Sequence, residues 1–176
     1  MELNVPLQVI GVVRTGHAEL ESTPIQAAIN RAEQATIEIG DAYADGLDGL
    51  ADFDYAWMLT WLHQSDDPAN EPDMSRMPFL LRKQRRRIGL FATRAPRRVN
   101  SIGLSLIQVL RVSGSSVDFA GVDVIDGTPV IDIKPYVTRF DRPPGDPRCG
   151  WFDDVAIEEG VTPAKLGPPE ARPTSS

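Results

Sequence analysis

The sequence contains few of the side chains that most often bind metals or act as nucleophiles. Its 176 residues include one cysteine, Cys149, and two histidines, His17 and His63. A single cysteine excludes an internal disulfide and is compatible with a reducing compartment. A zinc site made of cysteine and histidine would lack ligands. We therefore expect a cytoplasmic protein without a bound metal.

Several common catalytic and nucleotide-binding motifs are also absent. The sequence has no G-x-x-x-x-G-K-[ST] loop, which excludes nucleotide binding of the P-loop type. No G-x-G-x-x-G opens a helix after a strand, so a Rossmann dinucleotide site is unsupported. The nucleophile motif G-x-S-x-G is missing as well, and its absence weakens a hydrolase interpretation.

Long hydrophobic runs are missing too. No apolar stretch approaches the roughly 20 residues that cross a bilayer. Residues 1–13 have no basic residue ahead of their short apolar run, unlike a signal peptide. Hydrophobic residues make up 41% of the chain and charged residues 24%, which is typical of a soluble protein, and the length suits one domain. We expect no contact with a membrane.

Short apolar segments at close spacing are the main structural pattern present. Alternating or β-branched residues predict strands, and we expect residues 55–62, which contain two tryptophans, to be buried on both faces. The only convincing helix pattern spans 25–34. Frequent turns between short strands predict an all-β protein, either a barrel or a sandwich. The predicted strands are residues 7–15, 35–39, 55–62, 86–92, 103–112, 116–120 and 130–134.

Two segments have loop composition. Residues 65–78 contain three prolines and several acids, and we expect a loop there. From residue 160 the chain is rich in proline, glycine, serine and charge, so 160–176 is predicted to be a disordered tail. Residues 1–159 are then one domain.

Charge is distributed unevenly. Residues 82–98 contain eight arginines and lysines and no acid, so this segment carries +8 and leaves −15 on the rest of a chain whose net charge is −7. A basic segment on an acidic body is what a localised polyanion site would look like. A basic strand edge that discourages aggregation explains it equally well.

Polar loops follow several of the predicted strands. Arg94 ends one strand, where it can bind a carboxylate or phosphate with its fork of donors, or form a weak surface ion pair. His63 and Gln64 end another strand and suit either a ligand's polar edge or contact with water. Asp126 precedes Gly127 and is explained by a turn, whereas Asp123 is not and suits a cation or a ribose.

Together these segments resemble the TrmO family, also called YaeB-like or TsaA-like proteins. The resemblance covers roughly residues 7–152. It implies a non-Rossmann β-barrel, a homodimer with the cofactor near the subunit interface, and S-adenosylmethionine as cofactor. It also implies methylation of N6 of threonylcarbamoyladenosine, next to the anticodon of tRNA. The matching segments are residues 10–15, Gly49-Leu50 with Phe53, and residues 89–94, 102–105, 126–130 and 132–136.

This reaction needs a base and a tRNA contact, which residue type, position and charge indicate, and cofactor-binding residues, which the resemblance implies. Asp126, or less favourably His63, is the candidate base that removes the proton from the acceptor nitrogen. The basic segment is the candidate tRNA contact, through Arg85, Arg86, Arg87, Arg97, Arg98 and Asn100. The implied cofactor-binding residues are Pro24, Gln26, His63, Gln64, Arg94, Leu104, Asp123, Val124, Ile125 and Asp126.

The chain departs from the family pattern in three places, one of which is residues 77–82, where the Pro-Pro-Arg-Leu-Gly-Gly run expected before the basic segment is replaced. Ile25 stands where the family usually has arginine, and residues 95–101 lose two turn prolines and gain an arginine. We expect cofactor binding to survive these changes and the methyl acceptor to be the property they affect. Two alternatives therefore stay open. One is a methyltransferase acting on a small molecule or another modified nucleoside, and the other is a cofactor-binding module without catalysis.

Overall fold

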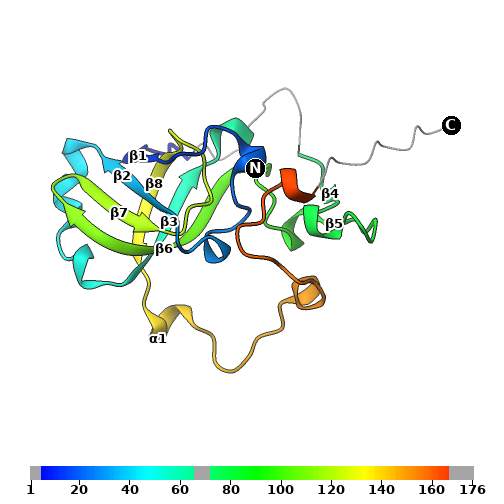
Figure 1. Ribbon diagram of the computed structural model, residues 1–176. Helices are drawn as coiled ribbons and strands as arrows, with labels where there is room; N and C mark the ends of the chain where they lie inside the picture. The colour runs from blue at the N-terminus through cyan, green and yellow to red at the C-terminus, as the bar shows by residue number, and fades with distance from the viewer. Residues whose placement is uncertain (1–4, 66–71, 167–176) are drawn as a thin grey trace.

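Six antiparallel strands close into a barrel in the computed structural model, which describes residues 5–65 and 72–166 (Figure 1). The prediction of a non-Rossmann all-β fold is confirmed, and of the two predicted architectures the protein adopts the barrel. The strands are β1 (Gly11–Arg14), β2 (Gln34–Ile39), β3 (Tyr55–Trp61), β6 (Ile102–Ser113), β7 (Ser116–Ala120) and β8 (Pro129–Pro135), and they pair in the closed order β1-β2-β7-β6-β3-β8.

The barrel closes around one hydrophobic core because alternate residues of each strand face inward. On β3, Ala56 and Met58 are fully buried, while the tryptophans at 57 and 61 are only half-buried on the outer face. The prediction that this strand is buried on both faces is therefore wrong. The largest core side chains, all without exposed surface, are Val13, Ile37, Met58, Ile107, Val117 and Phe119.

The predicted helix at 25–34 is also wrong. This segment forms only the 3-10 turn η2 (Ala27–Ile29), and β2 already begins at Gln34. Short isolated helices are marginal in water, so contacts elsewhere decide the conformation. Here the Asn30 side chain donates to the carbonyl of Val122, 2.8 Å away, and fixes the segment against a distant loop.

Two of the predicted strands are shorter than expected. Residues 86–92 contribute only β5 (Ile88–Gly89), which pairs with β4 (Ser75–Arg76) in a small separate ribbon, before the turn η7 (Leu90–Ala92). In the segment 7–15, only Gly11–Arg14 is strand, because these are the residues that find partners on β2 and β8.

The connections otherwise contain short helical turns. Among the described residues, none of the helices is long and apolar enough to cross a membrane. The remaining turns are η1 (Leu20–Ser22), η3 (Asp41–Leu47), η4 (Leu50–Asp52), η5 (His63–Ser65), η6 (Phe79–Leu81), α1 (Thr138–Asp141), η8 (Gly150–Asp154) and η9 (Ala164–Leu166).

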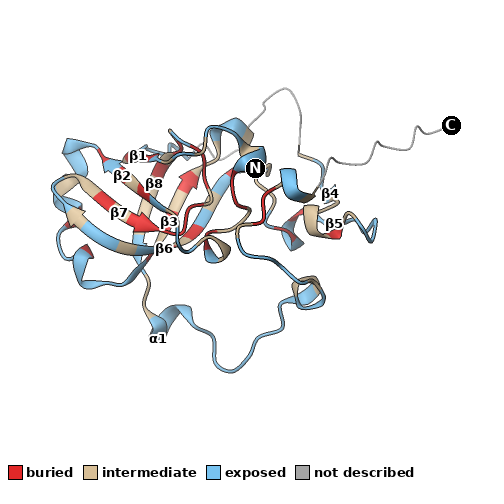
Figure 2. Cartoon of the chain, in the orientation of Figure 1, coloured by how far each residue is buried: buried red, intermediate tan, exposed pale blue. Residues whose placement is uncertain are grey.

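After β8 the chain forms an exposed arm, residues 138–149, that extends away from the barrel before returning (Figure 2). The return is fixed where the Trp151 indole donates to the carbonyl of Ala92 at 2.8 Å. Of the segment 160–176, predicted to be a disordered tail, residues 160–166 have defined contacts. Val161 is buried and its carbonyl accepts from the Ile25 amide, 3.1 Å away. The other residues of that segment lie outside the described residues.

Candidate functional site

The loop of residues 122–126, between β7 and β8, is the centre of the candidate site. Two glycines with positive φ flank it, Gly121 at 93° and Gly127 at 73°. Such angles suit glycine because it has no Cβ. They turn the chain out of the barrel wall and back again, so that the loop presents its polar residues at one end of the barrel.

Asp123 is the most tightly held residue of this loop. Its Oδ2 accepts a hydrogen bond from the Ala27 amide at 2.9 Å, and its Oδ1 accepts one from the Ser105 hydroxyl at 2.7 Å. Burial raises the pKa of this carboxyl, although these two donors and the nearby Arg94 guanidinium oppose the shift. A buried acid with a perturbed pKa and a cation beside it is typical of a ligand-binding site.

Arg94 lies immediately after η7, and its Nη2 donates to the carbonyl of Leu104, 3.0 Å away. The Leu104 side chain points outward from β6 and is 44% exposed. The structure therefore brings together three predicted cofactor residues, Arg94, Leu104 and Asp123. Together they offer a cation, an apolar surface and an anion.

The segment that contains the predicted cofactor residues Pro24 and Gln26 reaches the same place through its main chain. Pro24 is buried, and the Gln26 amide side chain donates to the neighbouring carbonyl of Ile25 at 2.6 Å. The peptide that follows Gln26 supplies the Ala27 amide to Asp123. This segment thus orients the acid, and its position depends on Ile25, whose amide is bonded to Val161.

The other three residues of the loop differ in what they expose. Val124 and Ile125 are each only 4% exposed, so they present little surface that a ligand could touch. Asp126 is exposed. Its Oδ1 accepts from the Thr15 amide at 3.1 Å, and its Oδ2 lies 4.0 Å from Arg14 Nη1. Asp126 therefore also has a structural role, since it caps the end of β1.

His63 and Gln64 lie in η5, immediately beyond β3, and both are exposed. The preceding Leu62 amide donates to the carbonyl of Ser101 at 2.7 Å, which places the pair at the end of the barrel where Asn100 leads into β6. Within the described part of the chain, neither side chain makes a hydrogen bond to the cluster around Asp123. His63 and Gln64 would therefore act together with the Asp123 cluster only through a ligand that contacts both.

Sequence reasoning missed two kinds of residue at this site. Ser105 was a detectable candidate, because it is a polar residue at an inward position of a strand, between Gly103 and Ile107. His17 and Glu33 were not, because they are far apart in sequence. The structure places His17 Nε2 2.9 Å from Glu33 Oε1.

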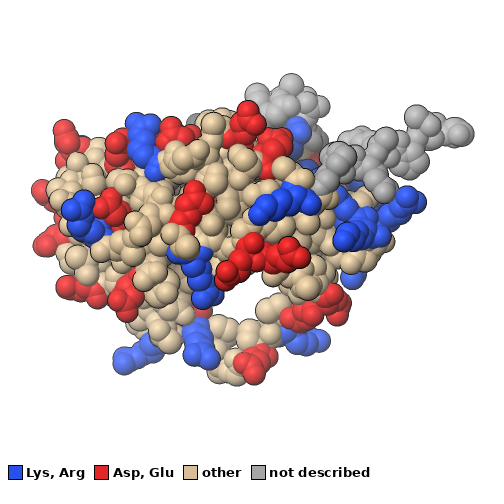
Figure 3. Space-filling model, viewed as in Figure 1, with Lys and Arg blue, Asp and Glu red and all other residues tan. Residues whose placement is uncertain are grey.

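The basic segment forms a separate surface around β4 and β5. Figure 3 shows lysine and arginine side chains gathered over this end of the molecule. Arg85 and Arg86 are exposed there, and Asn100 is exposed at the start of β6. Arg76, which the sequence analysis did not select, has its pKa lowered by burial and by the nearby Arg97 and Arg87, so several guanidinium groups converge.

Two arginines of the segment have local structural partners. Arg87 pairs with Asp73 and also contacts Ser75, and Arg98 donates to the carbonyl of Thr93 at 2.9 Å. These contacts hold the β4–β5 ribbon and the loop that carries Arg94. Some of the N–H donors of Arg87 and Arg98 are therefore already used within the protein. The exposed Arg86 is better placed to contact a polyanion.

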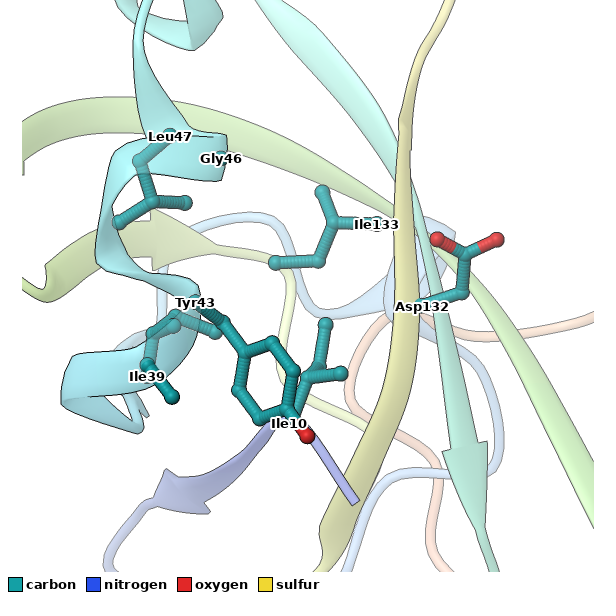
Figure 4. Close-up of a pocket in the computed structure, with 8 residues that line it drawn as sticks. Ile10, Ile39, Tyr43, Gly46, Leu47, Asp132 and Ile133 are labelled. Carbon is teal, nitrogen blue, oxygen red and sulfur yellow. The ribbon is translucent and has the colours of Figure 1, made fainter. Parts of the chain in front are cut away.

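A hollow of about 390 Å³ lies at the opposite end of β1, between η3 and β8 (Figure 4). Its lining is mainly apolar, with Ile10, Ile39, Leu47 and Ile133 facing one another. Figure 4 shows the Asp132 carboxylate on the other side of β8, directed away from these side chains, and Asp132 pairs with Lys134 at 2.7 Å. Charged groups do not converge on this hollow, so it is a poorer candidate than the Asp123 cluster.

The fold and the Asp123 cluster define a class of protein: a closed antiparallel barrel that gathers an arginine, an apolar side chain and a buried acid at one end. The chain matches the family model for the tRNA-methyltransferase O N-terminal domain over residues 12–142. It therefore belongs to this family, and the predicted family assignment is confirmed.

Individual relatives agree. A protein from Archaeoglobus fulgidus named as a probable S-adenosyl-L-methionine-binding protein is 33% identical over 158 residues, 90% of this chain and 41% of its own length. A mouse protein named tRNA (adenine(37)-N6)-methyltransferase is 34% identical over 144 residues, 80% of this chain and 32% of its own. A crystal structure of TrmO from Pseudomonas aeruginosa superposes with a TM-score of 0.71 at 29% identity, covering 88% of this chain and 66% of that one. The chain thus spans less than half of the first two relatives, so similarity alone does not show that it shares their activities.

Proposed function

We propose that the chain is an S-adenosylmethionine-dependent methyltransferase that acts on N6 of threonylcarbamoyladenosine next to the anticodon of tRNA, in the cytoplasm. The observation that carries the proposal is the convergence of Arg94, Leu104 and Asp123 at one end of a barrel of this family. The names of the relatives from Archaeoglobus and mouse support the cofactor and the acceptor, respectively.

The side chains of the cluster fit the chemistry of S-adenosylmethionine. The contact to Leu104 engages one of the five N–H donors of Arg94, and the others suit the ligand's carboxylate. The Asp123 carboxylate has about four acceptor sites, of which its two bonds use two, and the rest suit a ribose hydroxyl or the ammonium group. The exposed Leu104 side chain offers an apolar surface for adenine.

The remaining task of the protein is to hold the acceptor in line with the methyl group and to remove a proton from it. When bound, S-adenosylmethionine would supply an electrophilic methyl group for transfer to N6, with its sulfur as the leaving group. A ureido-type N6 is a poor nucleophile, so it must lose its proton. Asp126 can accept that proton on Oδ2, because the Thr15 amide occupies Oδ1 and fixes the orientation of the carboxylate.

The basic segment supplies the tRNA contact in this proposal. Its exposed side chains, Arg86 among them, would neutralise phosphates around the anticodon, and affinity would then fall steeply with salt. The rest of the molecule carries −15 and would repel RNA, so binding is confined to this surface.

A homodimer is the second part of the proposal, and the outer face of β3 and β6 supports it. There Leu59 opposes Leu104 and Trp61 opposes Ile102, which is 38% exposed. Contiguous apolar surface of this kind marks an interaction site. The face includes Leu104, so a second subunit would lie beside the cofactor. An Ile102→Lys chain that sediments as the wild type would remove this interface.

The direct test is transfer of labelled methyl from S-adenosylmethionine to bulk tRNA from cells that lack this gene, followed by digestion and separation of nucleosides. Label on threonylcarbamoyladenosine is expected. Label on another nucleoside, or on a small molecule in a cell extract, would keep the enzyme class and change the acceptor. Binding of the cofactor with no acceptor in any fraction would leave a binding module. Asp126→Asn should bind the cofactor and lose about 100-fold in turnover, and wild-type turnover would remove its assignment as base.

A further inference from the structure

Glu33 contacts the candidate cofactor loop with both its main chain and its side chain, although it precedes β2 and is remote from the loop in sequence. Its carbonyl accepts from the Gly121 amide at 3.0 Å. Its Oε2 accepts from the Asn30 amide group at 2.6 Å, and the same nitrogen of Asn30 donates to the carbonyl of Val122 at 2.8 Å. One carboxylate thereby fixes the first end of the loop.

The other oxygen of the same carboxylate reaches the second end of the loop. Glu33 Oε1 lies 2.9 Å from His17 Nε2, and the carbonyl of His17 accepts from the Asp126 amide at 2.7 Å. The His17 amide in turn donates to the Thr15 hydroxyl at 3.0 Å, and the Thr15 amide donates to Asp126 Oδ1. The segment between β1 and η1 is thus held to the Asp126 end of the loop.

The two side chains are partly buried. The His17 side chain is 16% exposed and that of Glu33 is 34% exposed. Within the described residues, His17 Nε2 is buried and has no aligned hydrogen-bond partner, although Glu33 Oε1 lies 2.9 Å from it. Glu33 Oε1 is the polar atom that lies beside this buried nitrogen, so the two side chains fix each other's position by contact.

We propose that His17 and Glu33 are positioning residues that hold loop 122–126 in its ligand-binding conformation, with Asn30 completing the connection. The proposal rests on the proposed function, because it assumes that this loop binds S-adenosylmethionine. Neither side chain is placed to touch the reacting atoms. They act through the loop, whose Asp123 and Asp126 must stay within about 0.5 Å of their productive positions.

A second carboxylate in the barrel provides a matched control. Asp118 on β7 accepts from the Thr36 hydroxyl at 2.9 Å and pairs with Arg111 at 3.0 Å. It joins strands of the barrel wall in the way that Glu33 joins loops. If carboxylate bridges matter only for stability, replacing either acid lowers the melting temperature and leaves ligand affinity alone.

The experiment measures the Kd for S-adenosylmethionine by calorimetry on Glu33→Gln, His17→Gln, the double variant and Asp118→Asn, with the melting temperature of each. The two single variants are expected to bind about tenfold more weakly, and the double variant no more weakly than either, because the pair acts as one unit. Asp118→Asn keeps the wild-type Kd. At saturating cofactor the single variants retain kcat within about threefold, so the loss is in binding.

Wild-type Kd in folded Glu33→Gln and His17→Gln proteins overturns the inference while leaving the proposed function intact. Equal weakening in Asp118→Asn also overturns it, since any loss of stability would then be enough. Absence of binding by the wild type overturns both proposals. If Glu33→Gln does not fold, Asn30→Ala interrupts the same connection at Val122 and is expected to weaken binding by a similar factor.

Discussion

At the scale of single residues, two aspartates three positions apart have different environments. Asp123 accepts two hydrogen bonds inside the barrel end, and burial raises its pKa. Asp126 is exposed and caps a strand. This contrast supports different tasks for the two acids, with Asp123 holding a ligand and Asp126 open to exchange protons with a bound acceptor.

The raised pKa of Asp123 makes a prediction about stability. Between the ordinary value of 3.8 and the higher folded value, the folded state binds a proton that the unfolded state has lost, so stability falls as pH rises through this window. Asparagine does not titrate. The free energy of unfolding of Asp123→Asn, relative to wild type, should therefore improve as pH rises through the window, which urea titrations at several pH values will measure.

Asp118 provides a control, because its pKa is shifted in the opposite direction from that of Asp123. The Thr36 hydroxyl and Arg111 lower the pKa of Asp118, so its contribution is present above 3.8 and is lost as pH falls through the folded value. The free energy of unfolding of Asp118→Asn, relative to wild type, should therefore decrease as pH rises. Parallel behaviour of the two variants would contradict the assignment for Asp123.

How far the sequence predicts such residues depends on whether their partners are local. Motif matches were enough to select Arg94 and Asp123, but not to predict that the Ser105 hydroxyl and the Ala27 amide would hold the acid. The contact between His17 and Glu33 exists only because β1 and β2 are adjacent in the barrel. Residues at the two ends of a long connection between strands leave no local pattern to find.

At the scale of elements, strand pairing determined which of the predicted segments form strands, and local sequence patterns alone did not. The alternation in 35–39, 116–120 and 130–134 predicted strands that the barrel contains. The segment 25–34 has helix-like spacing, yet its hydrogen bonds go to other loops, so tertiary contacts override its propensity. The strand expected at 86–92 contains only two paired residues because only β4 lies beside it.

Pairing also makes a prediction about β1. Gly11 is buried opposite Ile39, and a Cβ added to it would press on the Glu38 carbonyl and come within 2.9 Å of Ile39 Cδ1. Gly11→Ala should therefore destabilise the protein by about 1–3 kcal/mol. Gly16 has nothing within 4 Å of such an atom, and Gly16→Ala should stay within about 0.5 kcal/mol of wild type. Urea denaturation compares the two, and equal losses would mean that crowding at β1 is not the cause.

The last described segment makes a second prediction at this scale. Val161 is 6% exposed and its carbonyl holds Ile25, while the Gly160 amide donates to the carbonyl of Ile29 at 2.6 Å. A chain ending at residue 159 should melt about 5 °C lower, because a buried valine is lost, and should bind cofactor more weakly, because the loop before Ala27 loses its support. A chain ending at residue 166 keeps these contacts and serves as the control. Identical melting of both would show that the contacts carry no stability.

At the scale of the whole molecule, charge is separated between a basic surface and an acidic body. The net charge of −7 opposes association with RNA at long range, while the +8 of residues 82–98 favours it at short range. Salt screens both effects, but phosphate contacts release bound counterions, so the basic surface should dominate the measured salt dependence. This separation also orients an incoming tRNA, since only one face attracts it.

The final prediction concerns a variant that lacks two cations of the basic surface. Lys83 and Arg86 are exposed, and replacing both with alanine should reduce the slope of log affinity for tRNA against log salt by about 1.5. The melting temperature should be unchanged, because exposed charges contribute little to stability. Arg139 and Arg142 lie in the exposed arm and remove the same charge elsewhere, so Arg139→Ala with Arg142→Ala should leave the slope near wild type. Filter-binding titrations from low to moderate salt measure both. If the two double variants lose slope equally, RNA responds to total charge alone, and residues 82–98 are not the tRNA-binding surface.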